Sequence, residues 1–411
     1  MSTVLELDPR LSSDVRALAD EVVALRRDFH QHPELLFDLP YTSQRVADYL
    51  RALGLEVKTG IGGSGVVGLL RGAKPGPTVL YRADMDALPL QEETGYPFAS
   101  ATEGLMHACG HDGHVAVGLV MARLLAARKD RQPGTVAFLF QPAEEGGDGA
   151  GAMIKDGVLD LVKPAVCFAM HLNNDETVGK VGVREGGVFA GSNEFRIVLA
   201  SKGGHGAAPH QAPDLIVVAS HIVLALQTVV SRTVDPLESA VVTVGLLHAG
   251  TKSNILPTTT LLEGTVRTFD RALAMQVAQR IEAIARAIAG AHGAGIDYTF
   301  EPNYPPTVNA PGPTALVDGV VRGLLGADGV TRFRTMGSED MSRFLELVPG
   351  CYYNIGSAHP KGADTFPHHS GRFNPDERAL SLAVEVGVRV IEAALARPDG
   401  GAAAEGSPGP R

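Results

Sequence analysis

Hydrophobic positions in the first 190 residues of the chain follow two different periods. Apolar residues recur at helical spacing over 13–29, 42–54 and 114–129, and Gly54 ends the second of these segments. Short continuous apolar runs predict buried strands at 65–70, 78–82, 135–140 and 165–170. Because strands that alternate with helices form sheets with parallel pairs and helices on both faces, this part predicts an α/β domain.

The pattern changes at about Ser192. From there the chain predicts a strand, a helix, two adjacent strands, a second helix and a closing strand, at 193–200, 213–233, 239–249, 258–269, 272–293 and 296–302. This order, βαββαβ, is that of the ferredoxin-like split unit, a self-contained two-layer domain. The sequence therefore predicts a smaller ferredoxin-like domain inserted into the larger α/β domain.

The α/β pattern resumes with a strand at 351–356 and a long final helix. We expect this helix to start with Asn374 as N-cap, Pro375 at the first helical position and Glu377 in a capping box. The predicted domains are 1–190 and 305–396 for the two parts of the larger domain and 191–304 for the insertion. The last segment, 397–411, is rich in Gly, Pro and Ala and is expected to be disordered.

Composition narrows the class of protein. The chain has 411 residues, more than the roughly 250–300 at which one core stops growing, and 45% are apolar, which agrees with two packed domains. A formal net charge of −10 argues against nucleic acid or an anionic membrane as partner.

Three scattered cysteines do not form a disulfide framework. We find no signal peptide and no apolar run of about 18 residues, and so expect a soluble cytoplasmic protein.

Residues that can bind metal or transfer protons follow the predicted strands. In an open α/β sheet ligands bind beyond the carboxyl ends of the strands, so these side chains are expected at one edge. Each has an ordinary explanation when taken alone, as a turn former, a hydrogen-bonded histidine or a surface pair, but together they indicate a metal site. The segments carry Asp84 and Asp86, Glu144 and Glu145, His171, Cys109 and His111, and His368 and His369.

The mixture of thiolate, imidazole and carboxylate suits Zn²⁺, and Mn²⁺, Co²⁺ or Ni²⁺ can use the same set. The chain has no C-x-x-C, and dispersed ligands that include carboxylates are typical of a catalytic site rather than a structural one. About five candidate ligands leave room for two cations, a pair that stabilises hydrolytic transition states. A carboxylate beside them, Glu144 or Glu145, would act as the general base.

Two other chemistries compete with this interpretation. Cys109 precedes a predicted helix, whose dipole lowers the pKa of a thiol, and histidines follow it, so it is also a candidate nucleophile. That alternative leaves Glu145, His171 and His369 without a role. A metal-binding protein without catalytic activity is the third possibility, and it predicts stabilisation by metal but no amide cleavage.

The inserted domain carries its own candidates. His205 lies in a glycine-rich loop, where it could donate a hydrogen bond to a developing oxyanion, and Arg267 could bind a carboxylate with both guanidinium nitrogens. A turn histidine and a surface cation explain the same residues equally well.

Ten segments taken together resemble the amidohydrolase branch of the metallo-aminoacylase/carboxypeptidase family, which includes hippurate hydrolase, bacterial N-acyl-amino-acid amidohydrolases and auxin-conjugate hydrolases. The resemblance covers nearly the whole chain, and its most specific motifs are Cys-Gly-His-Asp-Gly-His and Glu-Glu-Gly. The segments are RRDFHQHPELLFD, RADMDALP, MHACGHDGH, QPAEEGGDGA, His171, KGGHGAAPH, SNILP, GTVRTFD, GSED and HHSGRF.

The resemblance implies a catalytic α/β domain with a dinuclear metal site and an inserted lid domain that forms a homodimer. Arg82 stands where other branches have a metal-binding histidine, and in this branch a cysteine is a ligand instead. Glu144 corresponds to the general base, Asp84 lies beside the metals, and His205 stabilises the tetrahedral intermediate, within one subunit or across the dimer. Asn254 and Arg267 match substrate-binding positions. The implied metal ligands are Cys109, His111, Glu145, His171 and His369.

The segment HHSGRFNPDE departs from the family pattern at Gly371 and Pro375, and His368 is a competing ligand. We choose His369 because Ser370 and Phe373 then align with the family.

The sequence thus predicts metal-dependent hydrolysis of an N-acyl or aryl-acyl amino acid amide, with two divalent cations per chain, Zn²⁺ or Mn²⁺ first and Co²⁺ or Ni²⁺ next. A dipeptidase or aminopeptidase of the same family is the alternative. It needs an acidic residue to bind a free substrate amine, and we identify none in the sequence.

Overall fold

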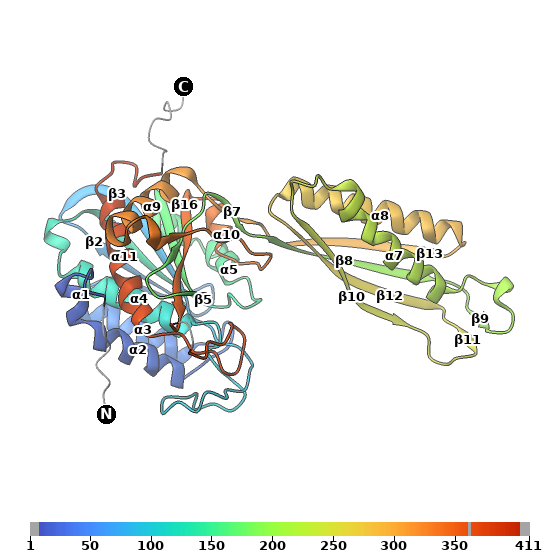
Figure 1. Ribbon diagram of the computed structural model, residues 1–411, viewed down its shortest axis with the longest axis horizontal. Helices are drawn as coiled ribbons and strands as arrows, with labels where there is room; N and C mark the ends of the chain where they lie inside the picture. The colour runs from blue at the N-terminus through green and yellow to red at the C-terminus, as the bar shows by residue number, and fades with distance from the viewer. Residues whose placement is uncertain (1–7, 361–362, 403–411) are drawn as a thin grey trace, which may run out of the picture. The chain divides into compact units, whose positions relative to one another are not determined.

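A computed structural model describes residues 8–360 and 363–402 of the chain, which form two compact units (Figure 1). Unit 1 contains the described residues up to Gly186, Val308–Phe333 and those from Arg343 onward, whereas unit 2 contains Gly187–Thr307 and Arg334–Ser342. The sequence placed the joints near 190 and 305, and Arg334–Ser342 is a further segment that it had assigned to the larger domain. Residues 397–402 form turns, and the rest of the predicted disordered tail lies outside the described residues.

Unit 1 is built on an eight-stranded mixed sheet. The pairs β4–β3, β3–β5, β5–β16 and β6–β15 are parallel, and the remaining neighbours are antiparallel. The central strands are buried on both faces, which explains their continuous apolar runs. The order is β1 (Glu56–Ile61), β2 (Gly65–Arg71), β4 (Pro133–Gln141), β3 (Lys74–Asp84), β5 (Val166–Thr177), β16 (Gly350–Ala358), β6 (Val181–Gly182) and β15 (Val330–Thr331).

Helices cover this sheet. The long helices α4 and α11 pack against the central strands, and α3 packs against β1 and β2. The largest hydrophobic core lies here, because alternate strand residues such as Val79, Tyr81 and Phe138 meet the apolar faces of these helices. The helices of unit 1 are α1 (Ser13–Ala17), α2 (Ala19–Gln31), α3 (Pro40–Ala52), α4 (His111–Ala126), α5 (Gly149–Lys155), α6 (Val158–Val162), α9 (Pro311–Leu325), α10 (Ser342–Leu345) and α11 (Arg378–Leu395).

The predicted start of the last helix is wrong. Helix α11 begins at Arg378 rather than after Asn374. The Asn374 side chain is used by the preceding loop, where it accepts from the Phe366 N–H at 2.9 Å and donates to the Asp364 carbonyl at 2.8 Å. The Asp376 N–H donates to the Ser357 carbonyl at 2.8 Å, so the chain stays non-helical through this segment.

Unit 2 has the predicted βαββαβ order, and the predicted fold class is confirmed. Helices α7 and α8 share one core with the sheet, which contains Phe195, Ile197, Ile222 and Ile281. The chain passes between the units through the short strands β7 (Gly186–Phe189) and β14 (Thr307–Asn309). The antiparallel sheet has the order β10 (Ala240–Ala249), β12 (Thr259–Thr268), β8 (Gly191–Ala200) and β13 (Gly295–Tyr304), with α7 (Leu215–Thr233), α8 (Arg271–Ala291) and the separate pair β9 (Gly204–His205) and β11 (Ile255–Leu256).

Helix α7 lies within the predicted helix 213–233 and is more apolar than the sequence suggested. We identified no apolar run of membrane-spanning length in the sequence, yet this 19-residue helix has the length and mean hydropathy of one. Its buried face, which includes Val218, Ile222 and Val229, packs in the core of unit 2, as the helix of a two-layer domain does.

Candidate active site

The candidate site lies at the carboxyl ends of three neighbouring parallel strands. In the register of β3 and β4, Asp84 faces Gln141, so the segment after β4 that carries Glu144 and Glu145 begins beside Asp84. His171 lies within β5 rather than after it, because that strand continues to Thr177. The topology thus brings together chain segments that are far apart in sequence, as the sequence predicted from the shared sheet edge.

Two backbone features present the remaining ligand-capable side chains. Gly110 has φ of +91°, a left-handed conformation that glycine adopts without strain, and it turns the chain from Cys109 into α4, whose first residue is His111. His369 also has a positive φ, +61°, and its N–H donates to the Ala108 carbonyl at 2.9 Å. A left-handed histidine is uncommon, and here the bond to Ala108 holds its ring beside Cys109.

Five of the predicted residues form one cluster. The Cys109 Sγ lies 3.5 Å from the His171 Nε2 and 3.4 Å from the His369 Nε2. The His369 Nε2 is 3.3 Å from a carboxylate oxygen of Glu145. The ligand atoms group as Cys109, His111 and His171, and as Cys109, Glu145 and His369, with all atoms of each group within 4.8 Å of one another.

Hydrogen bonds orient the cluster histidines as metal ligands need to be oriented. The Nδ1–H of His111 donates to the Asp86 carbonyl at 2.7 Å, and that of His171 donates to the Leu172 carbonyl at 2.5 Å. Because a carbonyl only accepts, Nδ1 of both rings carries a proton, so Nε2 is the nitrogen that each ring turns toward the cluster and would offer to a cation. Within the described residues, the buried Nε2 of His111 has no hydrogen-bond partner. These donors fit a divalent cation.

Asp84 and His114 lie beside this cluster but are committed to each other. The Leu172 N–H donates to the His114 Nε2 at 3.0 Å, so the His114 proton is on Nδ1, which donates to Asp84 at 2.5 Å. The other Asp84 oxygen accepts from the buried Arg82 guanidinium at 2.5 Å. Burial alone would raise the pKa of Asp84, but His111 and Arg82 hold it well below its usual value. Asp84 is therefore an anion that fixes His114 and Arg82.

The structure separates the two competing histidines. The His368 Nε2 accepts from the Asn174 N–H at 3.3 Å, and its ring packs on Phe373. His369, by contrast, presents its Nε2 to both Cys109 and Glu145.

A second buried network supports the start of α4, and the sequence analysis singled out neither its Arg26 nor its His30. Asp112 accepts from Arg26 at 3.0 Å and contacts the His30 Nδ1 at 2.7 Å, and all three side chains are buried. Arg26 and His30 lie on α2 at a spacing of four residues, so this network ties α2 to the helix that carries His111. That spacing was the only signal in the sequence.

The surroundings of Cys109 do not favour a thiol nucleophile. Burial, together with the charge of Glu145, raises the pKa of the Cys109 thiol well above its ordinary value in the metal-free chain. Nucleophilic cysteines need a lowered pKa and a histidine that an Asn or Asp orients. His171 is oriented by a backbone carbonyl instead.

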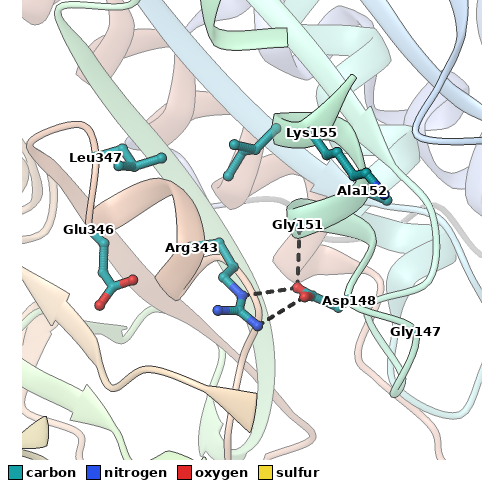
Figure 2. Close-up of a pocket in the computed structure, with 9 residues that line it drawn as sticks. Gly147, Asp148, Gly151, Ala152, Lys155, Arg343, Glu346 and Leu347 are labelled. Carbon is teal, nitrogen blue, oxygen red and sulfur yellow. Dashed lines mark hydrogen bonds and ion pairs between the residues drawn. The ribbon is translucent and has the colours of Figure 1, made fainter. Parts of the chain in front are cut away.

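The loop after Glu145 is fixed at its far end by Asp148. Asp148 has φ of +54°, and its carboxylate accepts from the Gly151 N–H at 3.2 Å and from Arg343 at 3.1 and 2.9 Å (Figure 2). Figure 2 shows these contacts on one side of an open pocket of about 480 Å³ that Lys155 and Glu346 also line. The Arg343–Asp148 pair is a second contact that the sequence did not indicate.

The three residues predicted in the inserted domain belong to unit 2, and the structure does not bring them together. His205 and Asn254 are neighbours, because the Gly206 N–H donates to the Asn254 carbonyl at 2.9 Å. His205 is in the two-residue strand β9 rather than in a loop. Arg267 lies near the other end of β12, opposite Ser192, and its Nη1 is buried without a hydrogen-bond partner among the described residues.

Comparison with known proteins places this arrangement among hydrolases. The model of peptidase family M20/M25/M40 matches residues 80–393. The chain is 39% identical to thermostable carboxypeptidase 1 of Saccharolobus solfataricus over 92% of its own length and 96% of the relative. It is 40% identical to the N-acetyldiaminopimelate deacetylase of Bacillus cytotoxicus over 88% and 95% of the two chains.

A solved structure shares both the fold and the size of the chain. The Bacillus subtilis YXEP protein, described as a dinuclear metal binding peptidase, is 33% identical, with a TM-score of 0.80 over 91% of this chain and 97% of that one.

Proposed function

Because this chain belongs to peptidase family M20/M25/M40, we propose that it hydrolyses the amide bond of N-acyl amino acids with two divalent cations and a glutamate base. The observation that carries the proposal is the cluster of Cys109, His111, Glu145, His171 and His369, whose donor atoms face one another. Among residues 8–360 and 363–402 the His111 Nε2 has no hydrogen-bond partner. A relative that is a deacetylase of an N-acetyl amino acid supports the substrate class.

The two groups of ligand atoms define where the cations would bind. One site would use Cys109, His111 and His171, and the other Cys109, Glu145 and His369, so that the Cys109 thiolate belongs to both. Bound cations supply a Lewis acid that polarises the amide carbonyl and acidifies water. The set of sulfur, nitrogen and oxygen donors favours Zn²⁺ or Mn²⁺ and also accommodates Co²⁺ or Ni²⁺.

Glu144 is the base in this proposal. One of its carboxylate oxygens lies within 4.8 Å of the ligand atoms of His111 and Glu145, next to the cluster but outside both three-residue groups that share Cys109. Glu144 takes the proton of the attacking water and returns it to the leaving amine nitrogen. Asp84 contributes indirectly, because it orients His114 and neutralises Arg82.

Unit 2 would supply the substrate contacts, His205 to the oxyanion and Asn254 and Arg267 to the amino acid carboxylate. Gly203 lies against Thr258, so β9 is at the end of the sheet where β12 begins (Figure 1). At about 3.3 Å per residue, roughly 26 Å separate Thr259 from Arg267 along β12. A small substrate cannot contact both ends of this sheet, so we propose that His205 and its neighbour Asn254 reach the site of a second copy in a homodimer.

The exposed side of β10 supports such a dimer. This edge strand exposes Val241 and Leu247, and Leu224 on the adjacent α7 is 69% exposed. The opposite edge, β13, exposes Asp297 and Glu301, charges of the kind that prevent strand pairing. An unprotected apolar edge strand indicates an interface.

The double variant Leu224→Glu, Leu247→Glu should convert a dimer of 43.1 kDa chains into monomers, because it buries charges in the interface. Light scattering after size exclusion measures the mass. Met275→Glu, at an exposed position on α8, is the control and should remain dimeric. A fully active wild-type monomer would contradict the dimer.

Removing the metal should abolish hydrolysis. We expect dialysed protein to hold up to two cations per chain by ICP-MS, to lose activity on N-acetyl and N-benzoyl amino acids after chelation, and to regain it when one divalent ion is added back. Faster cleavage of dipeptides than of N-acyl amino acids would favour the peptidase alternative. Undiminished activity without metal would contradict both metal-dependent functions.

The three cysteines are free and buried, as is common where thiols stay reduced, and this supports a cytoplasmic location.

A further inference from the structure

Asp86 is a buried carboxylate that the mechanism above does not use. It lies two residues beyond Asp84, just after the end of β3, and its side chain is 1% exposed. The sequence offered two roles for it, a carboxylate at the edge of the metal site or a turn former. A buried carboxylate needs hydrogen-bond donors, so its partners show what the fold uses it for.

Each oxygen of Asp86 accepts one backbone N–H from a different glutamate. The Glu144 N–H donates to one oxygen at 3.0 Å, and the Glu145 N–H donates to the other at 3.0 Å. Two bonds to one planar carboxylate fix the positions of the Ala143–Glu144 and Glu144–Glu145 peptide groups. The directions in which the two side chains leave the backbone are therefore set by Asp86.

The same residue also holds His111. Its backbone carbonyl accepts the His111 Nδ1–H at 2.7 Å, the bond that turns Nε2 toward the cluster. Asp86 is itself anchored on both sides, because the Met85 N–H donates to the Gln141 carbonyl and the Ala87 N–H to the Glu34 carbonyl, each at 2.8 Å.

We propose that Asp86 is a positioning residue that fixes the Glu144 base and the Glu145 and His111 metal ligands relative to one another. This inference rests on the proposed function for the roles of those three residues. The loop that carries Glu144 and Glu145 needs such a constraint, because Ala143 has φ of +56°, a conformation that is strained for a residue with a Cβ and persists only when its surroundings hold it. Asp86 would act through its neighbours and would not contact substrate.

Asp86→Asn tests this inference with almost no change in volume. The amide accepts through one oxygen only, so its NH₂ must face the N–H of Glu144 or Glu145, donor against donor. We expect metal affinity to fall about 10- to 100-fold, as is typical when a residue that orients a metal ligand is lost. kcat should fall by a similar factor with little change in KM, and the peptide 142–149 should exchange its amide hydrogens faster.

Glu385→Gln is the matched control. Glu385 is 3% exposed in unit 1 and accepts from the Ser12 N–H at 2.9 Å and from its hydroxyl at 2.7 Å, on α11. It should lower the melting temperature without changing metal affinity or the exchange of 142–149. A merely structural role for Asp86 would give the same result in both variants and would overturn the inference.

Two further measurements keep the test decisive. If Asp86→Asn does not fold, exchange in the wild-type chain decides, since unprotected amides at Glu144 and Glu145 would overturn the inference and protected ones support it. Metal titration and hydrogen exchange need no substrate. A wild-type chain that binds Zn²⁺ or Mn²⁺ but cleaves no amide would therefore refute the proposed function while leaving the Asp86 result to be judged separately.

Discussion

Replacing Glu144 with glutamine should lower kcat by about 10²- to 10⁴-fold, the usual contribution of a general base, while the fold and the bound metal are kept. Glutamine has nearly the volume of glutamate, but its amide cannot take a proton from water. The Glu144 N–H keeps its bond to Asp86, so the turn should hold. We would measure kcat and KM on an N-acetyl amino acid together with the metal content of each preparation.

The neighbouring residue provides the control. Glu145→Gln weakens a group 3.3 Å from the His369 Nε2 that we assign to a cation, so it should lose metal as well as activity. The two variants would then lose activity for different reasons, because Glu144→Gln keeps its metal and Glu145→Gln loses it. Near-normal turnover in Glu144→Gln would remove Glu144 as the base.

Replacing Cys109 with alanine should cost both cations, because its sulfur belongs to both ligand groups. The loss in metal affinity should exceed the roughly 100-fold that follows removal of an outer partner, and activity should fall with it. Equilibrium titration with Zn²⁺ and with Mn²⁺ measures the affinity, and ICP-MS measures how much metal remains after dialysis.

Cys167→Ala is the matched control for Cys109, since Cys167 is a buried thiol in β5 whose Sγ donates to the Val348 carbonyl at 3.6 Å. It should keep metal and activity. The same experiment tests the nucleophile alternative, which predicts that Cys109→Ala is inactive yet binds metal as tightly as the wild type. That outcome would falsify the ligand assignment.

The cluster could be predicted from the sequence because the carboxyl ends of parallel strands share one edge of a sheet. Buried apolar runs located β3, β4 and β5, and this placed Asp84, Glu144 and His171 near one another without any knowledge of side-chain contacts. The order of elements in unit 2 was also evident, because helical and strand periods differ clearly.

What could not be predicted depends on contacts between segments distant in sequence. Aspartate is common in turns, and only the position of the 143–146 turn makes Asp86 an acceptor for two peptide N–H groups. His205 and Arg267 were assigned to one domain, but the length of β12 that separates them follows from the strand register. Asn374 matched a helix N-cap in the sequence, but in the structure its side chain bonds to the loop at 364–366 instead.

The order of the strands has a consequence for synthesis of the chain. Strand β16 lies between β5 and β6 in the sheet of unit 1, yet the ribosome makes it after all of unit 2. A nascent chain therefore carries Cys109, His111, Glu145 and His171 beside a gap in its sheet until β16 emerges, and His369 follows last. Unit 2 is almost continuous in sequence and can fold first. The metal cluster is thus completed only after β16 and the segment with His369 have been made, so a shorter nascent chain lacks the last of its ligands.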